Sequence, residues 1–248
     1  TVVVTVHGSN DAPTAVLDTN TATEGTTAAP TLVTGDLTPG TPGQDSDIDH
    51  GATITVAGVA AGAQASAAGN VATSVAGSYG AVLVAADGSY TYAADRADAL
   101  AAGVPANETF QVTVRDAAGA TSTSTLRFTV TGANDAAVIG TPDNATVTED
   151  TAVNGAGNLV ASGSIAISDA DAGQAAFQTT VTPVGSPLGT LAIAANGSYS
   201  YTVANAAVQS LGAGQSRVET FTVTALDGTT RQVSFTVLGT NDVPSIGN

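Results

Sequence analysis

Apolar and polar residues alternate in several short runs along this chain. Residues 110–114 and 126–130 carry Phe, Val or Leu at every second position, with mostly polar residues between them. Residues 221–223 and 233–237 repeat the same pattern in the second half of the chain. A period of two predicts strands that bury one face of a sheet.

Two further pairs of runs flank the dipeptides Asp87-Gly88 and Asn196-Gly197. The flanking runs are residues 79–84 and 89–92, and residues 188–193 and 198–201. Asp-Gly and Asn-Gly readily supply the positive φ angles of a type I′ turn. Each pair of runs is therefore predicted to form a β-hairpin closed by such a turn.

Little of the chain favours a helix. The Ala-rich segments 95–102 and 204–211, which end at Gly103 and Gly212, are each long enough for a single turn or a short helix. The Ala/Gly-rich stretch 57–77 has no clear pattern and is predicted to be a loop or an irregular insertion. Short strands with Gly-rich turns predict a β-sandwich of immunoglobulin-like topology.

A Gly-X-Asn-Asp phrase ends a strand-like run three times. The Asp residues of the phrase are Asp11, Asp135 and Asp242, so the intervals are 124 and 107 residues, each the length of one domain. The phrase therefore predicts two complete tandem repeats between partial ones. The predicted segments are the last strand of an upstream repeat at 1–8, a first repeat at 9–133, a second repeat at 134–241 and the start of the next linker at 242–248.

Charge and composition remove several classes of function. The chain has 21 Asp and Glu against 5 Lys and Arg, a net charge of −16, which disfavours binding to nucleic acid and to anionic membrane surfaces. It has no Cys for a disulfide or a thiolate metal site, and no apolar run long enough to insert into a membrane. Seventeen of the acids are Asp, the acid favoured in turns and metal loops, although a solvated acidic surface is the alternative.

An enzyme is not expected. His7 and His50 are the only histidines, and neither accompanies a Ser or Cys nucleophile in a recognisable motif. The chain has no phosphate-binding glycine loop. Its paired carboxylates recur with the repeats, as a structural site should and a single active site need not.

Several phrases in shared order resemble a known family. Residues 77–80, 86–92, 108–114 and 132–135, and the matching series from 187–190 to 239–244, are similar to the VCBS-type, cadherin-like repeats of large bacterial RTX adhesins. The resemblance implies an all-β chain of two tandem immunoglobulin/cadherin-like β-sandwich domains in an elongated arrangement. It further implies a secreted, cell-surface protein whose calcium-stiffened repeats hold a distal binding domain away from the cell, for adhesion or biofilm formation.

The resemblance also implies which residues bind Ca²⁺ at the joints between repeats. The matching positions are the early glutamates Glu24 and Glu149, the linker residues Asn10, Asp11, Asn134 and Asp135, the Asp-X-Asp loops Asp47, Asp49, Asp169 and Asp171, and the acids before the last strand, Asp116 and Asp227. Calcium takes six to eight oxygen ligands, and alternate residues of an extended loop can aim both carboxylates the same way. We expect Asn134, Asp135, Asp169, Asp171 and Asp227, with Glu149 or Glu24, to meet around calcium.

Other interpretations of these acids remain open. Each carboxylate could instead cap backbone N–H groups in an ordinary turn. Gly132, Ala133 and Ala136 around the linker offer only backbone, and no Asp-Arg-Glu loop is evident, so fewer ions or weaker binding is expected. A module that binds a sugar or a host protein is the alternative function. The expected partners are neighbouring repeats of the same chain, and the chain itself is expected to be monomeric.

Overall fold

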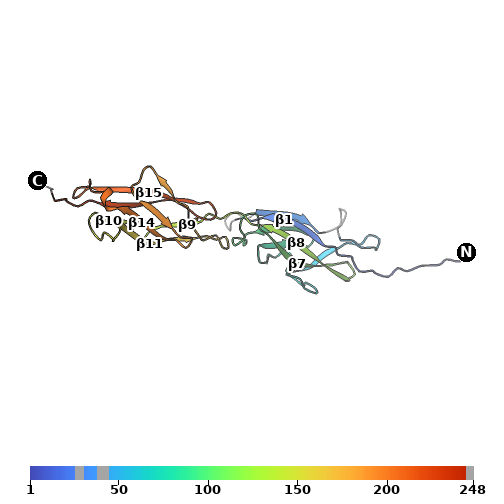
Figure 1. The fold of residues 1–248 in the computed structure, drawn as a ribbon. Coiled ribbons are helices and arrows are strands. Elements are labelled where there is room, and N and C mark those ends of the chain that lie inside the picture. Colours follow the sequence, from blue (N-terminus) through green and yellow to red (C-terminus); the bar gives the residue numbers. More distant parts are fainter. Residues whose placement is uncertain (26–30, 38–44, 244–248) are drawn as a thin grey trace. The chain divides into compact units, whose positions relative to one another are not determined.

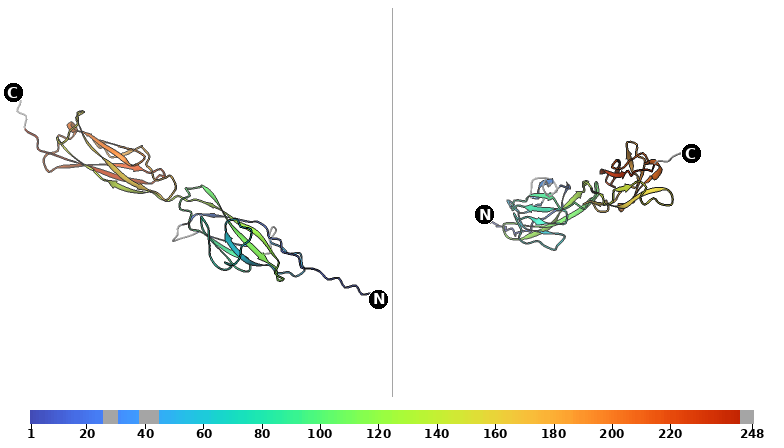
Figure 2. Two further views of the ribbon diagram at one scale, coloured as in Figure 1. Left: turned by 90° about the horizontal axis from the view of Figure 1, so that it is seen from below. Right: turned by 90° about the vertical axis from the view of Figure 1, so that its left-hand side faces the viewer.

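The computed structural model describes residues 1–25, 31–37 and 45–243, and it divides into two compact units, Thr1–Ala133 and Asn134–Asn248. Each unit contains two four-stranded sheets that enclose a core (Figure 1, Figure 2). The described residues form no α-helix, and one 3₁₀ turn, η1 (Asn205–Ala207), is the single helical element among them. The all-β sandwich prediction is confirmed.

In the first unit, one of the two sheets brings the first and last strands together. One sheet has the order β1 (Asp18–Thr23), β8 (Thr121–Thr131), β7 (Pro105–Arg115), β3 (Thr55–Ala61), and the other has β2 (Thr31–Asp36), β6 (Ser89–Ala94), β5 (Ala81–Val84), β4 (Val75–Ala76). β1 pairs in parallel with β8, with Asp18 opposite Leu126 and Thr23 opposite Thr131. The segment before β1 and the segment after it therefore lie at opposite ends of β8.

The second unit repeats this arrangement. One sheet has the order β10 (Thr146–Thr148), β16 (Thr230–Leu238), β15 (Ser216–Thr224), β12 (Thr182–Val184), and the other has β13 (Thr190–Ile193), β14 (Ser198–Ala204), β11 (Asn158–Ser168), β9 (Val138–Pro142). β10 is parallel to β16, as β1 is to β8. The early strand of this unit is split, because β9 joins one sheet and β10 joins the other.

The inward positions of the alternating runs form one core in each unit. Tyr92 stacks on Phe128 in the first unit with ring centroids 3.9 Å apart, and Phe110 meets both rings edge-on. Tyr201 and Phe235 stack at 4.6 Å in the second unit, with Phe221 edge-on. Offset and edge-to-face aromatic pairs contribute about 0.5–1.5 kcal/mol each beyond their buried area. These few rings therefore anchor cores that are otherwise built mainly from Val, Ala, Leu and Ile.

Both predicted hairpins form, but the predicted type I′ turn is wrong. β5 pairs with β6 and β13 pairs with β14. Only the glycine of each dipeptide has a positive φ, 90° at Gly88 and 85° at Gly197. The Gly88 N–H donates to the Ala85 carbonyl at 3.1 Å, and the Gly197 N–H donates to the Ala194 carbonyl at 2.9 Å. Each hairpin thus has a three-residue loop with a left-handed glycine last, the next most common solution after two-residue loops.

The prediction for residues 57–77 is only partly correct. Residues 57–77 are not simply a loop, because they include most of β3 and all of β4 (Val75–Ala76). The segment between them packs against β3, where Gly58 has no room for a Cβ, and against β7, where the Ala67 N–H donates to the Thr113 hydroxyl at 2.9 Å. Residues 95–102 form turns, and residues 204–211 include the 3₁₀ turn η1, so both Ala-rich segments take the single turn that was one of the two predicted outcomes.

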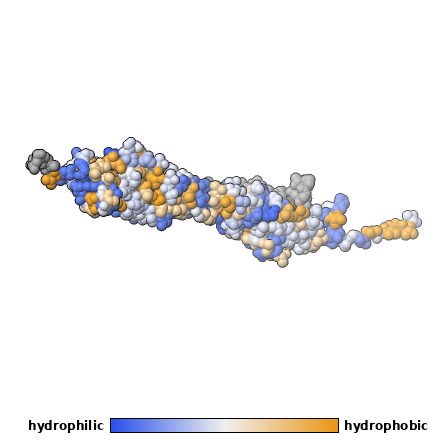
Figure 3. Space-filling view, viewed as in Figure 1, coloured by the Kyte–Doolittle hydropathy of each residue, from blue (hydrophilic) through white to orange (hydrophobic). Residues whose placement is uncertain are grey.

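The opening run of valines does not form a strand. Val2, Val3, Val4 and Val6 are each at least 77% exposed, and Figure 3 shows this run as a hydrophobic stretch. None of the strands among the described residues pairs with it. A β-branched run has high strand propensity, but a strand needs a partner for its backbone groups.

Candidate metal centre

Hydrogen bonds tie four predicted ligand positions to one another or to the linker at the amino-terminal end of the second unit. The Asp135 N–H donates to Asp171 Oδ2 at 3.0 Å, and the Asp171 N–H donates to Asp169 Oδ1 at 2.9 Å. Asp227, in the loop between β15 and β16, accepts a bond from the Ala137 N–H at 3.1 Å. The Asp-X-Asp loop and the β15–β16 loop are therefore both tied to the linker that carries Asn134 and Asp135.

The first unit has the same arrangement at its own amino-terminal end. The Asp11 N–H donates to Asp49 Oδ2 at 2.8 Å, and the Asp49 N–H donates to Asp47 Oδ1 at 2.9 Å. The side-chain amide of Asn10 donates to Asp116 Oδ2 at 2.7 Å. Since two segments 124 residues apart fold into the same set of contacts, the contacts are a property of the repeat.

The two glutamates lie at the other end of each unit. Glu24 Oε2 accepts a bond from the Ala133 N–H at 2.7 Å, and Glu149 Oε2 accepts one from the Thr240 N–H at 3.0 Å. β16 runs from the Asp227 loop toward Thr240, and its nine residues rise roughly 26 Å at about 3.3 Å per residue. Glu149 therefore cannot share one ion with Asp171 and Asp227 of its own unit, which corrects that alternative and leaves Glu24 as the predicted glutamate.

Buried carboxylate oxygens without a partner mark these positions. Among the described residues, the buried side-chain polar atoms that lack a hydrogen bond are Asp47 Oδ2, Asp95 Oδ1, Glu149 Oε1, Asp169 Oδ2 and Asp171 Oδ1. Glu149 and Asp171 are 0% and 1% exposed. A buried oxygen anion without a partner is costly, and a hard cation is the ligand that satisfies it best. The donor set fits calcium.

Among the described residues, neither end of either unit supplies a complete set of calcium ligands by itself. Within the described part of the chain, no three acids or histidines converge closely enough to hold a metal ion. Calcium needs six to eight oxygens, so Asn side-chain oxygens, backbone carbonyls, water or a neighbouring segment would have to complete each site.

Hydrogen bonds keep two of the candidate ligands ionised. Asn10, with the backbone of the turn at Gly119 and Ala120, holds the pKa of Asp116 below its usual value. Burial raises the pKa of Asp227, but hydrogen bonds from Thr229, Ala137 and Asn134 outweigh it, so the net pKa is lowered. Both groups are therefore carboxylates at neutral pH, which is the form that binds a cation.

One candidate ligand escaped the sequence analysis. The Gly25 N–H donates to the Ala94 carbonyl at 2.9 Å, so Glu24 and Asp95 stem from neighbouring backbone positions at the carboxyl-terminal end of the first unit. Asp95 Oδ1 lacks a hydrogen bond but lies 3.7 Å from Arg96 Nε in a partly exposed ion pair, which a metal ion there would have to displace. The signal was the Asp95-Arg96 pair, the first two residues of the Asp-Arg-Glu loop that the chain otherwise lacks. The second unit has Ala204 and Asn205 at the end of the matching strand.

Comparison with protein families agrees with this repeated design. The family model described as bacterial cadherin-like domain matches residues 10–132 and again residues 134–239. The chain belongs to the bacterial cadherin-like domain family. No curated protein matches it in sequence.

Solved structures give the same fold for the two cadherin-like domains. The structure described as "PcdhgB3 EC1-4 in 50 mM HEPES" has a TM-score of 0.52 at 13% identity, over 92% of this chain and 50% of that chain. Mouse cadherin-23 EC22-24 has a TM-score of 0.50 at 15% identity, over 93% and 67%. The chain thus spans half the length of the PcdhgB3 structure, and at these identities the likeness shows the fold alone.

Family membership sets the general class of the protein. Cadherin-like domains are extracellular, and they typically have adhesive or structural rather than enzymatic roles. No helix in the described ranges has the length and apolar character needed to cross a membrane.

Proposed function

We propose that the two cadherin-like domains are calcium-stiffened extender repeats of a secreted bacterial adhesin of the VCBS/RTX type, which space a distal binding domain from the cell surface. The observation that carries this proposal is the set of buried carboxylate oxygens without a hydrogen-bond partner at the ends of both units. Four of those five oxygens belong to residues that the resemblance to VCBS-type repeats implies as calcium ligands.

Calcium would act on the joint through the charges gathered there. Two carboxylates about 4 Å apart repel by roughly 4 kcal/mol at an effective dielectric constant of about 20. A divalent cation between them reverses the sign of that interaction. We propose that Asn134, Asp135, Asp169, Asp171 and Asp227 of the second domain share calcium with Glu24 of the first, because Ala133 and Asn134 are consecutive in the chain.

The expected stabilisation is modest for each site but repeats along an array. Extracellular modules bind calcium with dissociation constants of about 0.1–1 mM. At tenfold over the dissociation constant, binding adds about 1.4 kcal/mol per site to the free energy of unfolding. A longer chain of such repeats would gain this amount at every joint.

Calorimetric calcium titration and thermal melts of the whole chain test the proposal. Asp171→Asn should weaken calcium binding and reduce the calcium-dependent rise in Tm, because it removes a buried charge that only the cation pairs. It should leave the calcium-free Tm unchanged or raise it, because the amide oxygen can still accept the bond from Asp135 and a buried charge is removed. Asp135→Ala should weaken binding in the same way.

Asp87→Asn is the matched control, since Asp87 lies in a hairpin turn and the second repeat has Asn196 at that position. This variant should keep the wild-type calcium response. If Asp171→Asn and Asp135→Ala also keep it, these acids are ordinary turn residues and the proposed site is wrong.

A further inference from the structure

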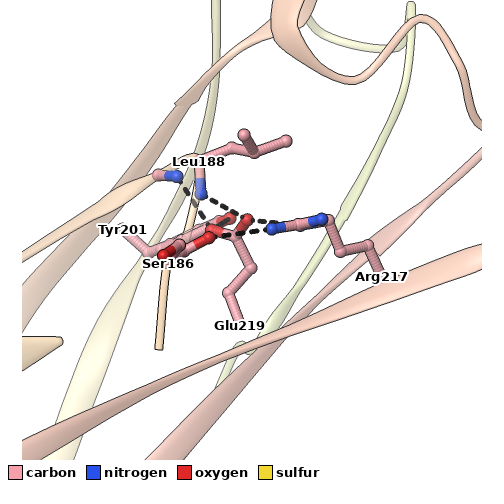
Figure 4. A network of polar contacts seen from close by, with 6 residues as sticks. Ser186, Leu188, Tyr201, Arg217 and Glu219 are labelled. Carbon is pink, nitrogen blue, oxygen red and sulfur yellow. Dashed lines mark hydrogen bonds and ion pairs between the residues drawn. The ribbon is translucent and has the colours of Figure 1, made fainter. Parts of the chain in front are cut away.

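A buried glutamate in the second unit accepts hydrogen bonds from four surrounding donor groups. Glu219 is 2% exposed and lies on β15 with its carboxylate turned inward (Figure 4). It accepts bonds from the Leu188 N–H at 2.7 Å, the Gly189 N–H at 2.8 Å, the Tyr201 hydroxyl at 2.8 Å and Arg217 Nε at 2.9 Å. This site is separate from the candidate calcium ligands.

The first unit has the same feature two residues before its own core phenylalanine. Glu108 is 5% exposed and precedes Phe110 as Glu219 precedes Phe221. Its carboxylate accepts bonds from the Tyr92 hydroxyl at 2.6 Å, from the Tyr79 N–H at 3.0 Å and from the Ser78 N–H. Its recurrence in both repeats shows that the contact belongs to the repeat design.

Glu219 holds the segment that closes one side of the sandwich. β12 and β13 are edge strands of the two sheets, and residues 185–189 cross from one to the other. Arg217 fastens the same crossing, because its Nη2 donates to the Ser186 carbonyl at 2.9 Å. The crossing is thus fixed to β15 and β14 through one carboxylate and one guanidinium.

Protonation would break this set of contacts. A carboxylate is an acceptor only, and all four partners of Glu219 are donors. A neutral carboxyl group would place its own O–H among these donors, where only the Tyr201 oxygen can turn to accept it. The Leu188 and Gly189 N–H groups would then lose their bonds to a charged acceptor, which are among the stronger hydrogen bonds in proteins.

We propose that Glu219 is a proton-sensitive latch, whose protonation releases residues 186–189 and opens the sandwich between β12 and β13 while the rest of the unit stays folded. The charged and titratable groups that face Glu219 are Arg217 on its own strand and Tyr201 on β14. Burial raises the pKa of Glu219, but the bonds from Leu188, Gly189, Tyr201 and Arg217 outweigh it, so the net pKa is lowered. The latch is therefore closed at neutral pH and opens only in acid.

Amide hydrogen exchange of the whole chain, followed by NMR from pH 7 to pH 3 in saturating calcium, tests the latch. The protection factors of Leu188 and Gly189, corrected for intrinsic exchange, should fall about tenfold or more in acid before the core strands lose protection. Glu219→Gln, which places an amide donor among the donors, should show this loss already at pH 7. Arg217→Gln should move the wild-type transition to higher pH, because it removes a cation that favours the charged form.

Glu108→Gln is the matched control, because it should release Ser78 and Tyr79 and leave Leu188 and Gly189 protected. The proposal is overturned if Leu188 and Gly189 keep their protection until the whole unit unfolds in acid. Unchanged protection in Glu219→Gln at pH 7 would overturn it too. If Glu219→Gln does not fold, the pH series of the wild type and of Arg217→Gln decides between the outcomes.

Discussion

Burial gives two aspartates of this chain different roles. Asp171 is almost fully buried. Its Oδ2 accepts a hydrogen bond from the Asp135 N–H, and its Oδ1 has no hydrogen-bond partner, as expected of a metal ligand. Asp18, at the start of β1, is only half-buried and faces another acid, Asp45. There, burial and then repulsion from Asp45 raise the pKa of Asp18 to about 6.

This shift predicts that Asp18 destabilises the first unit at neutral pH. Between about pH 4 and pH 6 the folded chain keeps a proton on Asp18 that the unfolded chain has released, so this group lowers the free energy of unfolding as pH rises. A shift of about two units corresponds to roughly 3 kcal/mol, which solvent screening at a half-exposed site reduces to about 1 kcal/mol.

Asp18→Asn should therefore raise the Tm of the first unit more at pH 7 than at pH 5, where only part of this loss of stability has occurred. Thermal melts of both proteins at the two pH values measure this difference. An advantage of the same size at pH 5 and pH 7 would show that the effect does not come from the charge of Asp18.

At the scale of elements, the crossing between β12 and β13 depends on a glycine. A Cβ at Gly189 would lie 2.7 Å from a ring carbon of Tyr201, 2.8 Å from its hydroxyl oxygen and 2.9 Å from the Thr202 carbonyl oxygen. Two of these atoms belong to a core ring that cannot move without disturbing Phe235. Overpacking of this kind typically costs about 1–3 kcal/mol.

Gly189→Ala should therefore lower the Tm of the second unit by several degrees. Gly212→Ala is the matched control in the same unit, since its Cβ would meet only Gln215 Oε1, at 3.8 Å. Differential scanning calorimetry of both variants measures the effect. Equal shifts in the two variants would mean that the contact with Tyr201 does not restrict this position.

Strands were predictable from the sequence where local pattern decides the structure. The runs around Phe110, Phe128, Phe221 and Phe235 alternate cleanly, and all four rings are buried. The sequence located both hairpin turns correctly but predicted the wrong turn type, because Asp-Gly and Asn-Gly suit both the two-residue and the three-residue loop. Between residues 57 and 77, tertiary contacts such as Ala67 on Gly58 decide the path, and no local pattern encodes them.

The candidate site was predictable in its members but not in its geometry. The recurrence of Asn-Asp and Asp-X-Asp identified the acids that the fold ties together at each amino-terminal end. Sequence could not show that Glu149 lies at the far end of β16, because that depends on the parallel pairing of β10 with β16. Nor did it single out Glu219, whose importance comes from four donors that only the fold assembles.

At the scale of the whole molecule, we propose that calcium fixes the joint between the two cadherin-like domains. The second unit begins at Asn134, directly after Ala133 of the first, and Asp169 and Asp171 of the second unit each have a buried carboxylate oxygen without a hydrogen-bond partner. An array built from such joints would be extended in calcium and bend at the joints without it.

Small-angle X-ray scattering of this chain, in millimolar calcium and then after chelation, tests that claim most directly. We predict an elongated particle with a narrow spread of dimensions in calcium. Removing calcium should shorten the average dimension and broaden its distribution, because like charges at the joint then repel. An unchanged maximum dimension and an unchanged spread after chelation would contradict the account, because calcium would then not set the geometry of the repeats.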